Sequence, residues 1–272
     1  VVHEECVGNE HQSHSFVRGN WGNEEKSSPM LLQKSCHDID ILQWLIGKKC
    51  KKVQSFGSLS YFIPENAPEG APMFCVEGCP AKDTCFYNAE KIYIENNDED
   101  NWFRAHAAKI PEPDNDTMRE VISTTNYGKC VFKCDNNVVD HQTVNMLFED
   151  DITVMFSMCC FNKGARFTHI MGTKGELHAP LDTENPIRFY AFATRKTEEI
   201  PLTTSSNDVA GGHAGGDDGI INDFYDYVTG NYEGKSIPDI SESYMNHLIT
   251  FAAEEARKTG KIIDIDEYIN SL

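Results

Sequence analysis

The sequence contains 272 residues, 40% of them hydrophobic and 25% charged, which is the composition of a globular protein with a full hydrophobic core. Acidic residues number 43 and basic residues 24, so the formal net charge of −19 argues against nucleic acid or anionic lipid as a partner. No apolar run is long enough to cross a membrane, and the first residues are not a signal peptide, so we expect a cytoplasmic protein.

The first predicted elements are an extended segment over residues 3–18 and a helix over residues 28–47. Ser28 is a good N-cap, Pro29 suits the first helical position, and Gly47 suits the left-handed position that ends a helix. Apolar residues on most sides of this helix predict that it is largely buried.

The predicted helix carries a histidine, His37, midway along its length. Gln33 lies one helical turn before it, so the two side chains share a face and can reach the same bound molecule. An imidazole exchanges protons near neutral pH, which makes His37 the best catalytic candidate in the sequence. The alternative is that His37 is a structural residue, the commoner role of a lone helical histidine.

Beyond this helix, a strand is predicted over residues 52–62, followed by a loop rich in Pro, Gly and Cys that runs to about residue 87. Short helices are expected at residues 88–94 and 115–125. In the second half of the chain, apolar and polar residues alternate, which predicts a series of antiparallel strands. These strands are expected at residues 138–148, 152–158, 167–171, 176–179, 187–194 and 198–202.

A Gly-rich loop at residues 211–219 leads into a predicted helix whose apolar residues begin at Ile220, and a last helix is expected from about Asp239 to Gly260. Antiparallel strands with helices at either end predict an α+β fold, in which helices cover one face of a large, open, mostly antiparallel sheet. We therefore expect residues 1–272 to form a single domain. The other face needs a cover, so we expect a homodimer or homotetramer that associates through it.

Ten cysteines are many, but a chain with a full core does not need disulfides, so we expect reduced thiols in a cytosolic protein. Three of them, Cys75, Cys79 and Cys85, share one loop and could hold a structural zinc ion, with Cys50 or His106 as a fourth ligand. The alternative is that they are free thiols in a long loop.

Four further residues are candidates for contact with a substrate. Arg18, together with Trp21, could clamp and stack on a polyol, although an Arg-Gly-Asn turn at the end of a strand is equally ordinary. His213 and Asp217 lie in the Gly-rich loop at a helix start, where backbone amides can face a ligand. The alternative for Asp217 is helix capping, a role that is compatible with ligand contact.

Six segments follow one another along nearly the whole chain: SFVRGNW (15–21), LLQKSCHDIDILQWLIG (31–47), CDNNVVDHQ (134–142), HIMGTKGELHA (169–179), GGHAGGDDGIINDF (211–224) and TGKIIDI (259–265). In this order they resemble the C-terminal domain of the Gfo/Idh/MocA family of oxidoreductases, which includes glucose–fructose oxidoreductase and inositol dehydrogenase. The resemblance implies a preceding Rossmann domain that binds NAD or NADP. No strand-linked G-x-G-x-x-G motif occurs, so we expect that this dinucleotide-binding domain is missing from the chain.

The resemblance also implies a role for His37. It would accept the proton of a substrate hydroxyl while a hydride leaves the same carbon for the nicotinamide. The family usually has an acid one turn earlier, where this chain has Gln33. Glutamine can orient a sugar hydroxyl, but it cannot supply a negative charge to stabilise an imidazolium ion.

Three functions follow as hypotheses. The first is the substrate domain of an NAD(P)-dependent dehydrogenase of a sugar, inositol or related polyol, with the fragment alone inactive. Gln33 leaves open a second, a relative that uses bound NAD to cleave glycosides without net redox change. The third is a non-catalytic carbohydrate-binding or scaffold domain.

Overall fold

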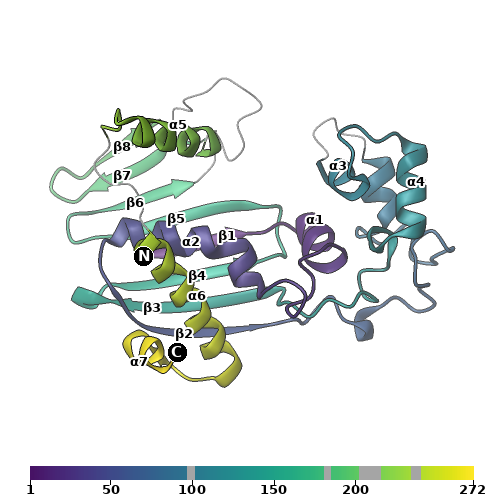
Figure 1. Cartoon of the computed structure of the whole chain (residues 1–272), viewed down its shortest axis with the longest axis horizontal. Coiled ribbons are helices and arrows are strands. Elements are labelled where there is room, and N and C mark those ends of the chain that lie inside the picture. Colours follow the sequence, from purple (N-terminus) through teal and green to yellow (C-terminus); the bar gives the residue numbers. More distant parts are fainter. Residues whose placement is uncertain (97–101, 181–184, 202–215, 234–239) are drawn as a thin grey trace.

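The computed structural model describes residues 1–96, 102–180, 185–201, 216–233 and 240–272. Its centre is a sheet of nine strands in the order β8-β7-β6-β5-β1-β4-β3-β2-β9 (Figure 1). The strands are β1 (Val2–Cys6), β2 (Cys50–Ser58), β3 (His141–Phe148), β4 (Thr153–Cys159), β5 (Ala165–Met171), β6 (Gly175–Pro180), β7 (Ile187–Ala191), β8 (Lys196–Ile200) and β9 (Ile263–Asp264).

All neighbouring strands run antiparallel except the central pair of β1 and β4, which is parallel. In β3 the side chains of Val144, Met146 and Phe148 are buried, while their neighbours in sequence point to the other side of the sheet. The alternation of the second half therefore produces strands with one apolar face, and the predicted α+β class with an open, mostly antiparallel sheet is confirmed.

Two long helices, α2 (Met30–Ile46) and α6 (Ile240–Thr259), pack on the same face of the sheet (Figure 1). Alanines 252, 253 and 256 of α6 are fully buried, and their small side chains let that helix approach its neighbours closely. Polar contacts also join the helices: the Asn246 side-chain amide donates to the Asp40 carboxylate at 2.6 Å. Below the helices lies the main core, which includes Leu31, Ile39, Leu42, Val144, Phe148 and Phe156.

Helix α2 begins and ends almost as predicted. Gly47 adopts the left-handed conformation, with φ 62°, and its N–H donates to the Gln43 carbonyl. At the other end, however, Pro29 is the N-cap and Met30 the first helical residue, so the predicted capping by Ser28 is one residue early. The prediction of a largely buried helix is also wrong: Trp44 is 71% exposed, because only one side of α2 faces the sheet.

A small helical lobe is inserted between β2 and β3, at the right of Figure 1. It contains η2 (Pro64–Asn66), η3 (Lys91–Glu95), α3 (Trp102–Ala108), α4 (Asn115–Thr124) and η4 (Asn126–Gly128). A core of its own, built from Cys75, Ala89, Ile92, Tyr93, Ala107, Met118, Ile122 and Tyr127, holds the lobe together. The two short helices expected at 88–94 and 115–125 are present within it as η3 and α4.

The predicted extended segment over residues 3–18 is wrong beyond its first residues. Strand β1 ends at Cys6, and the chain then forms α1 (Asn9–His11) and the π-helix η1 (Gln12–Arg18). Every residue of η1 is buried between the sheet and the helical lobe. A segment packed on all sides has no apolar stripe, so its period cannot be read from the sequence.

The C-terminal half adds α5 (Gly216–Thr229), which lies at the surface, and α7 (Ile265–Ser271) beside β9. Helix α6 ends before Gly260 as predicted, whereas its expected start at Asp239 lies outside the described residues. Within the described ranges, no helix combines the length and apolarity needed to cross a membrane.

Candidate active site

Four polar side chains of β1 and β5 face the underside of α2. The register pairs His3 with Thr168 and Glu5 with Arg166 across the two antiparallel strands. His3, Glu5 and Thr168 are buried. Because residues two apart on a strand share a face, the register places all four side chains below α2.

Asp38 of α2 lies at the centre of this group. Its Oδ1 is 3.1 Å from Nε2 of His3 and 2.7 Å from Nε of Arg166. The other ring nitrogen of His3, Nδ1, is 2.7 Å from the Thr168 hydroxyl. Asp38 is 0% exposed, so its charge depends on these partners rather than on water.

Glu5 supplies the second carboxylate of the group. Its Oε1 pairs with Nζ of Lys34 at 2.9 Å, and its Oε2 pairs with the Arg166 guanidinium. Two cations and two carboxylates therefore balance beneath α2. We call Lys34, Glu5, Arg166 and Asp38 the charge network.

The charge network keeps Asp38 ionised. Burial acts to raise the pKa of this carboxyl, but the hydrogen bond from His3 and the positive charge of Arg166 outweigh it, so the pKa lies below the usual value. At neutral pH Asp38 is therefore a fixed negative charge.

His37 stands at the open edge of the charge network. Its side chain is 51% exposed, Nε2 is 2.6 Å from Nη2 of Arg166, and the same nitrogen is 3.7 Å from Oδ2 of Asp38. A guanidinium can only donate, so Nε2 of His37 is the acceptor in this contact. Lying between a cation and a carboxylate, this imidazole nitrogen can accept a proton once the guanidinium moves away from it and keeps its pairing with Glu5.

The other predicted site residues lie in several places. Gln33 is half-buried on α2, one turn before His37, as expected. Arg18 is 2% exposed at the end of η1 and binds the carbonyls of Tyr87 and Lys129 in the helical lobe. Asp217 is exposed in the first turn of α5, and His213 lies outside the described residues. The roles expected for these residues stay predictions.

The predicted zinc loop has a different set of neighbours from the one expected. Cys75 is buried, and Cys79 and Cys85 are half-buried. Neither expected fourth ligand joins them: the Cys50 thiol donates to the Lys52 carbonyl in β2, and Nδ1 of His106 lies 2.9 Å from Nε2 of His14. Cys130 is the thiol that the fold brings to the loop.

Within the described ranges, two groups of side chains have the spacing of metal ligands, and neither includes a cysteine. Glu5, His37 and Asp38 form one, but Lys34 and Arg166 already neutralise its carboxylates, which disfavours a cation there. His169, Glu176 and His178 form the second group, on the open face of the sheet, and no further observation points to an ion there.

Sequence reasoning missed Glu5, Arg166 and His3 as members of the site. Their signal was the placement of ionisable residues at alternate positions of a central strand, where an apolar residue is usual. Asp38 carried a weaker signal, as a carboxylate adjacent to His37 on the inner side of an apolar helix.

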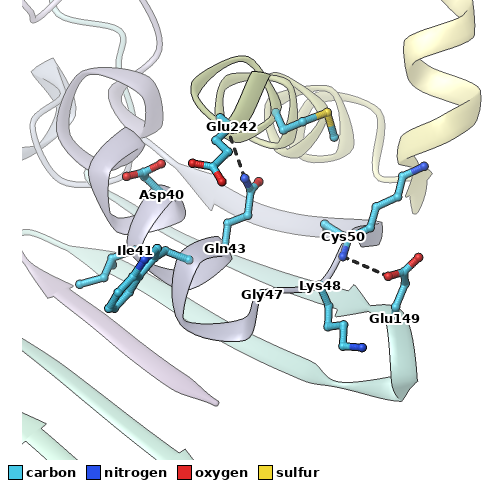
Figure 2. A pocket seen from close by; sticks show the side chains of 11 residues that line it. Asp40, Ile41, Gln43, Gly47, Lys48, Cys50, Glu149 and Glu242 are labelled. Carbon is cyan, nitrogen blue, oxygen red and sulfur yellow. Dashed lines mark hydrogen bonds between the residues drawn. The ribbon is translucent and has the colours of Figure 1, made fainter. Parts of the chain in front are cut away.

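A hollow of about 780 Å³ lies at the opposite end of α2 from its N-terminus. Figure 2 shows it between the last turn of α2, the start of α6 and the turn at Glu149, with Lys48 and Gln43 among its lining residues. Two polar contacts cross it, from the Gln43 amide to the Glu242 carbonyl and from the Lys49 N–H to the Glu149 carboxylate, both 3.4 Å. It contains no member of the charge network, so we do not place the chemistry there.

Comparisons with known proteins identify the relatives of this chain. Residues 5–265 match the family model described as "Oxidoreductase family, C-terminal alpha/beta domain". The chain is 25% identical over 214 residues to the protein YteT of Bacillus subtilis (strain 168), a match that covers 73% of this chain and 47% of that protein.

Solved structures share the fold. Levoglucosan dehydrogenase, in complex with NADH and levoglucosan, aligns with a TM-score of 0.58 and 11% identity over 97% of this chain and 58% of that one. The transcriptional regulator Gal80p from Kluyveromyces lactis aligns with a TM-score of 0.56 and 15% identity, over 98% of this chain and 54% of that one. The chain thus spans about half the length of the proteins it matches.

Proposed function

The chain belongs to the Gfo/Idh/MocA oxidoreductase family, as its C-terminal alpha/beta domain, and from this premise we propose that it is the substrate-binding half of an NAD(P)-dependent dehydrogenase. The substrate class is a sugar, inositol or related polyol. A nicotinamide-binding domain elsewhere in the same protein would supply the hydride acceptor. The length of the relatives supports this proposal, because this chain spans about half of each.

One observation carries the proposal: the half-exposed imidazole of His37 at the edge of the charge network. In the proposed reaction, Nε2 of His37 accepts the hydroxyl proton of the substrate as the hydride leaves the same carbon. A bound nicotinamide would supply the acceptor for that hydride.

Arg166 and Asp38 control when His37 acts as a base. While Arg166 donates to Nε2, the lone pair of that nitrogen is occupied. Glu5 is a second partner for the guanidinium, so Arg166 can release His37 without losing its counter-charge. Asp38 is then the nearest negative charge to the imidazolium that forms, and it takes the role that Gln33 cannot fill.

The test uses the polypeptide that contains this chain together with its nicotinamide-binding domain. His37→Asn keeps a polar side chain but removes the base, so NADH formation from a panel of sugars and polyols should fall about 10²–10⁴-fold. The affinity for NADH should stay within about threefold, because the cofactor is bound mainly elsewhere. His247→Asn, at a half-buried histidine on α6, is the matched control and should keep full turnover. Undiminished turnover in His37→Asn would refute the proposal.

A second candidate is a non-catalytic sugar-binding regulator. The occupied lone pair of His37 favours it, as does the shared fold with a protein described as a transcriptional regulator. Calorimetry that shows binding of a sugar, without NADH formation in the complete polypeptide, would support this candidate. Release of a free sugar from a glycoside without net NADH would instead identify the NAD-assisted glycoside hydrolase reaction.

We also propose that the chain assembles as a homodimer or homotetramer through the open face of the sheet. Phe56, Met155, Phe167 and Met171 are all exposed, and the strand register places them together on the face opposite α2. An apolar surface on several adjacent strands is typical of a protein interface. Light scattering should give at least twice the 30.6 kDa mass of one chain.

The ten cysteines fit a reducing compartment. All are free thiols, including the adjacent pair Cys159 and Cys160. We therefore propose the cytoplasm as the location of the protein, since structural disulfides are usual in oxidising compartments.

A further inference from the structure

The guanidinium of Arg18 is buried without a carboxylate. Among the described residues no acidic side chain pairs with it, and its Nη1 has no hydrogen-bond partner. Its Nε and Nη2 donate to the carbonyls of Lys129 and Tyr87 at 2.8 and 2.7 Å. A buried arginine cannot lose its proton, so a charge without a counter-ion is costly at this place.

The groups beside this guanidinium that can carry a negative charge are the phenol of Tyr93 and several thiols. Nη2 of Arg18 points at Sγ of Cys75, 3.7 Å away. Cys130 and Cys134 are also close enough for their charge to act on the guanidinium. Arg18 therefore faces sulfur where a carboxylate is usual.

Four thiols gather at this position from two separate parts of the helical lobe. Cys75 and Cys79 both lie close enough to Cys85 and to Cys130 for charge on one sulfur to act on the next. The backbone fixes the two segments to each other. The Cys75 N–H donates to the Gly128 carbonyl and the Cys130 N–H to the Met73 carbonyl, each at 2.9 Å.

The sulfurs are farther apart than a single zinc ion would hold them. In a tetrahedral zinc site the Zn–S bonds of about 2.3 Å set the sulfurs about 3.8 Å apart. Across the described residues, no three cysteine sulfurs lie within 4.8 Å of one another. An iron–sulfur cluster bonds its thiolates to several iron atoms and so spans more widely spaced ligands, which fits these four cysteines better than a single ion.

We propose that Cys75, Cys79, Cys85 and Cys130 ligate an iron–sulfur cluster, and that Arg18 balances part of its negative charge. Four thiolates give such a cluster a net charge of about −2, which supplies the anion that the buried guanidinium lacks. The cluster would fasten the loop at residues 75–85 to the segment at residues 128–130. It is separate from the site at His37 and does not depend on the function proposed for that site.

Ligation converts thiols into thiolates, the anions that Arg18 would face. Cys134 differs, because its thiol already donates to the Cys130 carbonyl at 3.4 Å. It therefore serves as a matched control.

The test is metal and sulfide analysis of the full chain purified without oxygen. We expect iron and acid-labile sulfide in equal amounts, four of each for a cubane or two of each for a smaller cluster. Cys79→Ser and Cys85→Ser should lose most of the iron, since both residues are half-buried and tolerate serine. Cys134→Ser should keep it.

Protein that takes up neither iron nor sulfide, even after reconstitution with ferrous iron and sulfide, would overturn the proposal. One zinc per chain without sulfide would also overturn it, as would loss of iron from Cys134→Ser alone. Circular dichroism of each variant separates loss of the cluster from loss of the fold. Reconstitution of the unaltered chain keeps the test decisive if a serine variant does not fold.

Discussion

Replacing Asp38 by asparagine should destabilise the protein through the charge network. The side chain keeps its shape and can still bond His3, but Arg166 and Lys34 then share Glu5 as their one carboxylate. Breaking a fully buried ion pair costs about 3–5 kcal/mol. Arg166 is 24% exposed and partly hydrated, so we expect a loss of about 2–3 kcal/mol in the free energy of unfolding.

Urea denaturation near neutral pH measures this loss, because urea, unlike guanidinium, does not screen ion pairs. The matched control is Asp150→Asn, which removes an exposed carboxylate paired with Lys48 at 2.8 Å and should leave the midpoint almost unchanged. If Asp38→Asn unfolds at the same urea concentration as the unaltered protein, the charge network does not stabilise the fold and the reasoning is wrong.

The effect of Asp38 should also depend on pH. Its pKa in the folded protein is below the ordinary value of 3.8, so the carboxylate stabilises the fold above that pH. As the pH falls through the folded pKa, both states become protonated and the contribution is lost. The difference in stability between the unaltered protein and Asp38→Asn should therefore be full above about pH 5 and shrink toward about pH 3. A difference that grows on acidification would contradict this sign.

Four further substitutions test other parts of the structure. Gly128→Ala should lower the free energy of unfolding by about 3 kcal/mol or more in thermal unfolding, since a Cβ there would lie 1.5 Å from the Ile122 carbonyl oxygen. Gly47→Ala, with open space around it, should lower it by about 1 kcal/mol. Asp140→Ala should cost about 2–4 kcal/mol in urea, because this buried carboxylate accepts two backbone N–H groups. Phe167→Glu should lower the mass measured by light scattering toward that of one chain, and an unchanged mass would count against the open face as the interface.

Much of the fold could be predicted from the sequence because its strands keep a period of two. Alternation at Val144, Met146 and Phe148 survives in the structure since one face of the sheet packs on the helices and the other stays open. The same logic failed for η1, which is buried on all sides. It also failed for Trp44, because an apolar residue on a helix does not reveal whether it faces the core or the surface.

The candidate site was predicted only in part. The position of His37 on α2, with Gln33 one turn away, follows from helix periodicity and family resemblance. Its partners could not be predicted in this way, because Glu5 lies in β1 and Arg166 in β5, which are far apart in the sequence. The two residues meet only through the pairing of β1 with β5. Cys130 was likewise missed beside the cysteine loop.

The amino-acid sequence by itself determined the family, the strand-rich second half and the helix that carries His37. These features depend on local periodicity and on motifs that follow one another in a fixed order along the chain. Tertiary structure alone decided which charges surround that imidazole, where the Arg18 side chain goes and which thiols become neighbours. The reason is that strand register and the docking of the helical lobe set distances between residues far apart in the chain, and no local pattern encodes those distances.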